Sequence, residues 1–130
     1  MEEYLKAVKS MSEKTRIRIL ALLHHAREIC VSEIVDALQE DQYKISRHLK
    51  VLQDAGMVVG SKKGLWIYYQ LNESQVHFQK MLLNAVKQVS AEIAREDLER
   101  LQQRLKQRAN NHCASSSTGN GKEESARYKV

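Results

Sequence analysis

The apolar residues of the first 55 positions recur at the three- and four-residue spacing of amphipathic helices. This spacing predicts four helices, over residues 5–11, 13–26, 31–38 and 42–55. Ser12, Ser32 and Asp41 stand where an N-cap side chain accepts a hydrogen bond from the helix backbone. Gly56 stands where a left-handed residue ends a helix. We therefore expect the first part of the chain to be a set of short, closely connected helices.

The pattern changes to period two after Gly56. Residues 57–61 and 65–71 are rich in Val, Ile, Tyr and Trp, the residue types that favour strands. Between them lies the polar run Lys62-Lys63-Gly64, which we predict to be the tip of a β-hairpin.

Helical spacing returns after the hairpin, with Ser74 as the expected N-cap of a fifth helix. Its apolar stripe runs from Phe78 to Leu105 and shifts by one position near residues 95–97, where we expect a kink, a break or a change of partner. From Asn110 the residues are small and polar, which is typical of disorder. We therefore predict one domain over residues 1–109 and a disordered polar tail over residues 110–130.

The predicted order of elements is that of a winged helix-turn-helix, a mainly α fold with a small β-hairpin. Charge supports a nucleic-acid partner for it. The chain carries a formal net charge of +5, and residues 41–63 hold five Lys or Arg against two Asp. Because a helix fits the major groove, the face opposite its buried stripe meets the bases. The residues that we predict to contact DNA lie on that face, on its flanks and at the hairpin tip: Gln42, Lys44, Ser46, Arg47, Lys50, Lys62 and Lys63.

Two simpler interpretations stay open for these residues. Lys and Arg often do no more than solvate a surface helix. A winged helix can also be a dimerisation scaffold without DNA binding, and the stripe from Leu82 to Leu105 fits a helix that pairs with a second copy. A scaffold, however, gives no reason to gather cations around one side of the molecule.

Three segments resemble the ArsR/SmtB family of metal- and metalloid-responsive repressors. They are residues 12–20 (SEKTRIRIL), 45–56 (ISRHLKVLQDAG) and 64–71 (GLWIYYQL). The second segment is similar to the recognition helix of that family, and the resemblance covers roughly residues 5–93. It implies a homodimer formed through the first and fifth helices. It also implies binding to an inverted-repeat operator in double-stranded DNA, and release when an inducer binds.

The chain departs from the family pattern at three places. Lys14 replaces a proline that is usual before Thr-Arg, and residues 39–41 (QED) replace a Gly-apolar-Ser turn. Two added carboxylates beside the recognition helix should weaken its attraction to phosphate, although Asp41 can still cap the helix. Leu65 stands where an arginine is common in the wing.

The resemblance to the family makes Cys30 a candidate ligand of the inducer. Arsenical-type members carry Cys-Val-Cys at the start of the third helix, and this chain has Cys30-Val31-Ser32. Thiophilic ions prefer two or three thiolates, and the only other cysteine is Cys113. We therefore name Cys30 and Cys113 as candidate ligands of arsenite or antimonite. The family's zinc-type site is not expected, because residues 84–109 contain no His.

Mechanisms of induction other than metalloid binding stay open, some of which involve the two cysteines and some of which do not. The two cysteines could instead form a redox-sensitive disulfide, a small organic inducer could act, or Cys30 could be a small apolar core residue. We expect DNA binding itself to require no cofactor.

Other classes of protein fit the sequence poorly. It has no glycine-rich phosphate loop and no His-Glu-x-x-His motif, and Cys30 near His24 and His25 lacks a third orienting residue, so we do not expect an enzyme. No stretch approaches the roughly 18 apolar residues of a membrane span, and the acidic start of the chain is followed by no apolar segment. Two cysteines suit a reducing compartment, so we expect a cytoplasmic protein without membrane association.

Overall fold

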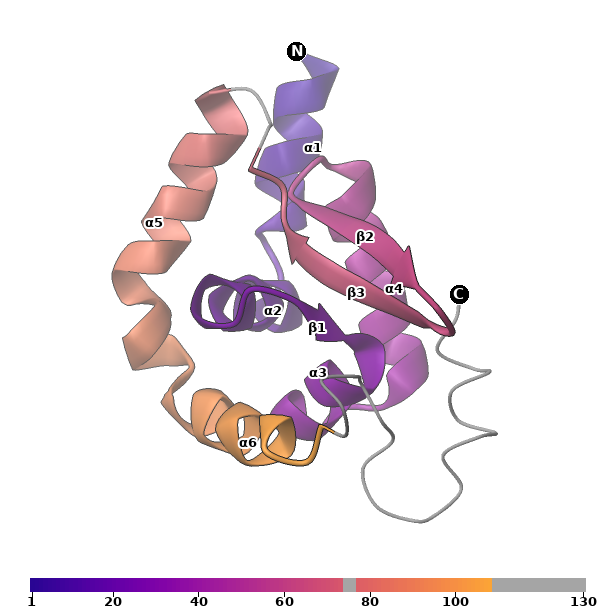
Figure 1. Ribbon diagram of the computed structural model, residues 1–130. Helices are drawn as coiled ribbons and strands as arrows, with labels where there is room; N and C mark the ends of the chain where they lie inside the picture. Colours follow the sequence, from indigo (N-terminus) through magenta and orange to yellow (C-terminus); the bar gives the residue numbers. More distant parts are fainter. Residues whose placement is uncertain (74–76, 109–130) are drawn as a thin grey trace.

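The computed structural model describes residues 1–73 and 77–108 of the 130-residue chain (Figure 1). Its elements follow the order α1 (Glu2–Ser10), α2 (Lys14–His25), β1 (Ile29–Cys30), α3 (Val31–Leu38), α4 (Gln42–Asp54), β2 (Val58–Lys63), β3 (Trp66–Leu71), α5 (His77–Ile93) and α6 (Arg95–Leu105). This confirms the mainly helical winged helix-turn-helix. The predicted cap Ser74 and the predicted tail, residues 110–130, lie outside the described residues.

Helix α2 lies at the centre of the molecule, enclosed by the other helices (Figure 1). Five consecutive residues of this helix, 19–23, are buried, so α2 is covered on every side rather than on a single stripe. Ile34 of α3, Leu49 of α4 and Val86 of α5 belong to the same core cluster. This shared core fixes the helix-turn-helix, α3 and α4, against α2.

Two of the predicted N-caps are wrong. The side chain of Glu13, not of Ser12, accepts the hydrogen bond from the backbone of α2, at 3.1 Å from Arg16 N. The Ser12 hydroxyl donates instead to the carbonyl of Lys9 at the end of α1, at 2.7 Å. The Ser12 hydroxyl therefore binds the end of α1 and does not cap the start of α2.

Helix α3 begins two residues earlier than a Ser32 cap requires. Its N-cap is Cys30, whose backbone N–H donates to the side chain of Glu33 at 3.1 Å. Ser32 lies inside the first turn and is buried. A carboxylate three residues after the cap holds the start of the helix, as in a capping box.

The sheet has three antiparallel strands in the order β1-β3-β2. The two-residue strand β1 was not predicted, and it pairs Cys30 with Tyr68. The hairpin turn also lies later than predicted. Lys62 and Lys63 belong to β2, and the pair Lys63–Trp66 closes the hairpin at Gly64 (φ +66°) and the following residue. The reason is that only the glycine adopts the left-handed backbone that the turn needs.

The long apolar stripe of the last third of the chain is divided between two helices. Ala94, fully buried, separates α5 from α6, which confirms the break predicted near residues 95–97. Helix α6 then turns and packs against α3 (Figure 1). Leu101 is buried there. The prediction of one pairing stripe from Leu82 to Leu105 is therefore wrong, because the α6 part of it belongs to the protomer's own core.

Buried ion pairs hold α6 and the residues after it on α3. Glu33 is fully buried, and its two carboxylate oxygens accept hydrogen bonds from Arg108 at 2.6 and 2.7 Å. Arg104, also buried, donates to Asp36 at 2.6 Å and to the hydroxyl of Ser32 at 3.1 Å. The hydrogen bond to Glu33 raises the pKa of Arg108. These pairs tie the C-terminal helix to the first helix of the helix-turn-helix.

Candidate nucleic-acid interface

Helix α4 has the two faces that the sequence predicted. Ile45, Leu49 and Leu52 are buried in the core, and Arg47 and Lys50 are exposed on the other side. The helix begins at the predicted cap, Asp41, which accepts a hydrogen bond from Lys44 N at 2.9 Å. It ends before Gly56, whose φ of +77° is the predicted left-handed conformation.

A groove of about 560 Å³ separates α4 from the hairpin. Four of the predicted contact residues line it together: Ser46, Arg47, Lys50 and Lys62. Ile67 and Tyr69 of β3 also line it. A Cβ at Gly60 would lie 3.0 Å from the ring of Tyr69, so the glycine lets this ring approach the strand. The groove thus combines exposed cations with an apolar lining.

The other predicted residues, Gln42, Lys44 and Lys63, do not line this groove. The ammonium of Lys44 forms an ion pair with Glu40 at 3.0 Å. The ammonium of Lys63 forms one with Glu28 at 2.7 Å. Both lysines therefore have an intramolecular partner that competes with a phosphate.

His48, on the flank of the buried stripe, connects α4 to the N-terminal helices. Arg16 donates to His48 Nδ1 at 3.1 Å and to the carbonyl of Ser10, at the end of α1, at 2.8 Å. Because a guanidinium only donates, His48 Nδ1 accepts and the ring is neutral, with its proton on Nε2. Burial lowers the pKa of His48, although the nearby Glu13 opposes this shift. Sequence reasoning missed this link, because the two residues are 32 positions apart.

Cys30 lies at the junction of β1 and α3 and is fully buried. Its Sγ is 3.4 Å from the hydroxyl of Ser32. Cys30 is disulfide-bonded in the structure, and Cys113, the other cysteine of the sequence, lies outside the described residues. Within residues 1–73 and 77–108, no group of three or more His, Cys, Asp or Glu is placed to hold a metal ion.

The segment before Cys30 contacts both the hairpin and the residues that follow α6. Glu28 binds Lys63 of β2 through its carboxylate and Arg108 through its carbonyl, at 2.8 Å. The ring of Tyr68 is within cation–π distance of both cations, 5.5 Å from Lys63 and 5.8 Å from Arg108. The cysteine segment, the wing and the residues that follow α6 are thus in direct contact.

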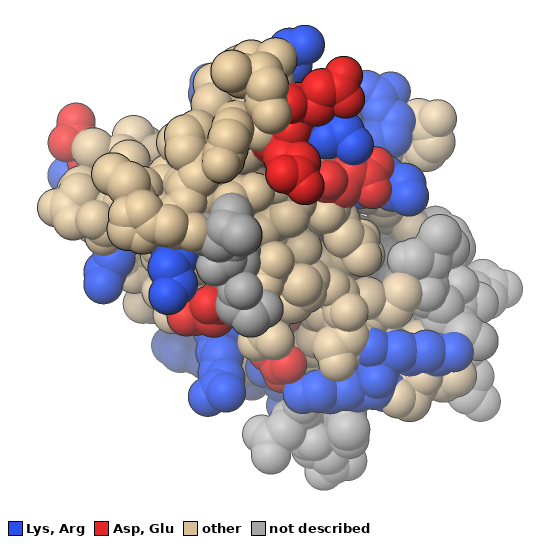
Figure 2. All heavy atoms as spheres, turned by 90° about the horizontal axis from the view of Figure 1, so that it is seen from above, with Lys and Arg blue, Asp and Glu red and all other residues tan. Residues whose placement is uncertain are grey.

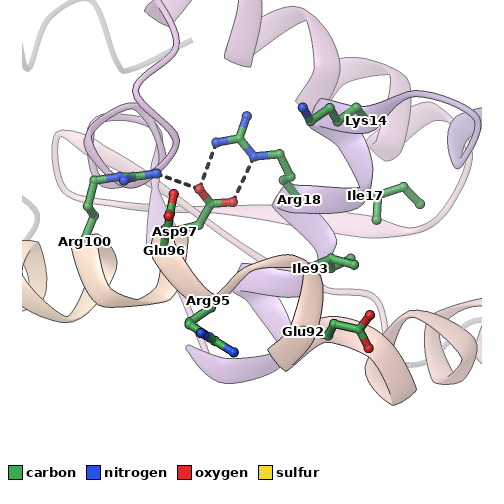
Figure 3. A pocket seen from close by; sticks show the side chains of 9 residues that line it. All are labelled: Lys14, Ile17, Arg18, Glu92, Ile93, Arg95, Glu96, Asp97 and Arg100. Carbon is green, nitrogen blue, oxygen red and sulfur yellow. Dashed lines mark hydrogen bonds and ion pairs between the residues drawn. The ribbon is translucent and has the colours of Figure 1, made fainter.

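A second cavity, of about 690 Å³, lies where α2 meets the junction of α5 and α6 (Figure 3). Arg18 donates two hydrogen bonds of 2.8 Å to the carboxylate of Asp97, and Arg100 adds a third of 2.8 Å. The bond to Asp97 raises the pKa of Arg18. Figure 3 shows these three side chains pointing toward one another. Because two guanidiniums neutralise the carboxylate of Asp97, the arrangement anchors the start of α6.

Comparison with known proteins identifies the family. Residues 13–59 match the family described as bacterial regulatory protein, arsR family. The chain is 36% identical to the arsenic resistance transcriptional regulator ArsR1 of Pseudomonas putida over 72% of its own length and 73% of the relative. This chain belongs to the ArsR family. Its resemblance to the ArsR/SmtB repressors is thereby confirmed. The matched residues include all of α2, α3 and α4.

Two further ArsR-family relatives match a shorter part of the chain. The arsenic resistance transcriptional regulator ArsR2 of P. putida is 45% identical over 49% of this chain and 56% of the relative. The arsenical resistance operon repressor of Escherichia coli is 37% identical over 52% of this chain and 58% of the relative. The chain thus matches little more than half the length of these two relatives. The family is described as one of bacterial regulatory proteins, and the three relatives named here are regulators or repressors rather than enzymes. In the described part of the chain, no helix has the length and apolarity needed to cross a bilayer.

Proposed function

We propose that this ArsR-family protein is a sequence-specific DNA-binding transcriptional repressor that acts as a homodimer on an inverted-repeat operator. The observation that supports this proposal best is the groove between α4 and the wing, where Ser46, Arg47 and Lys50 of the helix line the same space as Lys62 of the wing. A helix of this kind enters the major groove, and cations on its flank and on the wing bind phosphates.

Exposed apolar residues on two helices support the dimer. Helix α1 exposes Tyr4, Leu5 and Val8, and α5 exposes Met81, Val89 and Ile93. The rings of Tyr4 and Phe78 lie edge to face at 4.9 Å, so the two helices form one surface. Seen from above Figure 1, uncharged side chains cover much of the left half of the molecule, and charged ones gather toward its right and lower edges (Figure 2). To reach two half-sites, a dimer paired through α1 and α5 would have to hold its two α4 helices about 34 Å apart, one turn of DNA.

The inducer that we propose is a thiophilic metalloid such as arsenite. The relatives named above are arsenic or arsenical resistance regulators, and Cys30 lies at the start of α3. Arsenite needs at least a second thiolate, for which Cys113 is the candidate, and Cys30 itself binds only in its reduced form. Binding there would strain α3 and change the spacing of the two α4 helices. A coupling free energy of about 1–3 kcal/mol is typical of such a link.

The two cysteines of the sequence also allow a second candidate, control by thiol oxidation. In that case the oxidised and reduced forms would differ in their affinity for the operator, and arsenite would have no effect of its own. The experiment on the inducer described below distinguishes metalloid binding from thiol oxidation.

DNA binding is tested first, by fluorescence anisotropy on a labelled fragment of the gene's own upstream DNA under reducing conditions. Replacing both Arg47 and Lys50 by alanine should abolish binding and leave the dimer intact in sedimentation. A matched control replaces Arg95 and Lys106, two exposed cations of α6 and its C-cap, and should bind like the unaltered protein. If the unaltered chain does not bind this DNA, the proposal fails and the dimerisation scaffold becomes the favoured interpretation.

The inducer is tested on the preformed complex, with arsenite, antimonite, cadmium and zinc added separately. Release by arsenite or antimonite that is lost in Cys30→Ser would support metalloid sensing. Continued binding with all four, followed by release on addition of hydrogen peroxide, would support redox control instead.

A further inference from the structure

Tyr43 is an aromatic residue that the fold of the protomer does not need. Its side chain is 72% exposed, the most exposed aromatic among the described residues. It lies in the first turn of α4, on the side away from the core residues Ile45 and Leu49. It lines the groove between α4 and the wing.

The ring of Tyr43 contacts Arg47, a cation on the exposed face of α4. The guanidinium carbon of Arg47, one helical turn later, lies 5.6 Å from the ring centroid, within cation–π distance. Lys50 lines the same groove but has no such contact among those of the described residues, and its ion pair with Asp54 spans 3.7 Å. Of the two exposed cations on this face of α4, Arg47 is thus the one whose orientation is restricted before DNA arrives.

We propose that Tyr43 is a positioning residue for Arg47 and thereby determines specificity for a guanine in the operator half-site. The proposal rests on the proposed DNA-binding function. Arginine recognises guanine through two parallel hydrogen bonds to O6 and N7, which require the planar guanidinium to be correctly oriented. A ring that holds this plane lowers the entropy that Arg47 loses on binding. Phosphate contacts need no such orientation, so the ring affects discrimination between sequences rather than general affinity for DNA.

The test measures the affinity of five proteins for the operator and for a scrambled duplex of the same length. They are the unaltered chain, Tyr43→Ala, Tyr43→Phe, Arg47→Ala and, to complete the double-mutant cycle, Tyr43→Ala/Arg47→Ala. We expect Tyr43→Ala to lower operator affinity about three- to fivefold, as the loss of one exposed cation–π contact predicts. Its affinity for scrambled DNA and its salt dependence should not change. Tyr43→Phe keeps the ring and should bind like the unaltered protein.

The double variant separates positioning from direct contact with DNA. If Tyr43 acts through Arg47, removing Tyr43 has no further effect once Arg47 is gone. A second readout uses operators in which single guanines are replaced by 7-deazaguanine, which lacks the N7 acceptor. At one guanine position, the replacement should lower the operator affinity of the unaltered protein and leave that of Arg47→Ala unchanged. The loss of affinity at this position should be smaller in Tyr43→Ala than in the unaltered protein.

Two results would overturn the inference. They are an unchanged operator affinity in Tyr43→Ala, or an effect of Tyr43→Ala that persists in full in the Arg47→Ala background. Because Tyr43 is exposed, Tyr43→Ala should unfold at the same temperature as the unaltered protein, and circular dichroism checks this. If instead the unaltered protein does not discriminate the operator from the scrambled duplex, the proposed function fails and not the role of Tyr43 alone.

Discussion

Replacing Glu28 by glutamine should make the protein bind DNA more tightly. In the structure the carboxylate of Glu28 forms an ion pair with the ammonium of Lys63 at 2.7 Å, on the strand β2 of the wing. A DNA phosphate must compete with this carboxylate for the same cation. Glutamine keeps the size of the side chain and removes its charge, so that Lys63 becomes available to DNA.

The size of the effect follows from the exposure of the pair. The side chains of Lys63 and Glu28 are 51% and 25% exposed, so water screens the pair and its contribution is about 1 kcal/mol or less. Affinity should therefore rise by at most about fivefold. One additional phosphate contact should also steepen the plot of log affinity against log salt by about 0.9.

The assay is anisotropy on the operator at several salt concentrations between 50 and 200 mM, a range in which phosphate contacts strongly affect affinity. A general electrostatic effect has to be separated from the specific pair, because removing any negative charge near DNA favours binding. Lys63→Met provides this control. In that background Glu28→Gln should change neither the affinity nor the salt slope, since the cation that Glu28 restrains is absent.

The reasoning is refuted by either of two outcomes. The first is a gain in affinity that is equally large with and without Lys63, which would be a long-range charge effect. The second is an unchanged salt slope in Glu28→Gln, which would mean that Lys63 does not reach a phosphate even when it is released.

Three further predictions concern stability and assembly. Arg108→Met should lower the free energy of unfolding by about 3 kcal/mol in urea denaturation, because the fully buried Glu33 loses its main cation; a loss below 0.5 kcal/mol would contradict this. His48, whose pKa is lowered by burial, takes up a proton more readily in the unfolded chain, so its contribution to stability is complete above about pH 6.5 and decreases at lower pH; in His48→Gln the loss of stability between pH 7 and 5.5 should be smaller. Val89→Lys on the exposed face of α5 should yield folded monomers in sedimentation, and a persistent dimer would exclude this face.

Much of the fold could be predicted because local patterns dominate it. The stripe Ile45, Leu49 and Leu52, the cap Asp41 and the terminating Gly56 each act within a few residues, and the structure confirms all of them. The predicted residues of the groove between α4 and the wing could be found for the same reason. A surface helix shows which face is apolar, so its opposite face is known as well.

The parts that were missed depend on contacts between residues far apart in the chain. The strand β1 is only two residues long and exists because Cys30 pairs with Tyr68 of the hairpin. Ser12 and Ser32 are acceptable caps in isolation, but the end of α1 binds one hydroxyl and Glu33 takes over the start of α3. An apolar stripe looks the same in the sequence whether it packs against a second protomer or against the core of its own protomer. For this reason the stripe of α6 was predicted to pair with a second copy.

The ion pair between Glu33 and Arg108 has a consequence for how sequences of this kind can diverge. A carboxylate buried without its guanidinium is much less favourable than two apolar residues of similar size in the same places. Changes at positions 33 and 108 are therefore expected to occur together, although 75 residues separate them. An ArsR-family protein that lacks a counterpart of α6 and of the residues after it should carry an uncharged residue at the position of Glu33. Comparing the two positions across aligned relatives would therefore show which members share this C-terminal arrangement before any of their structures is known.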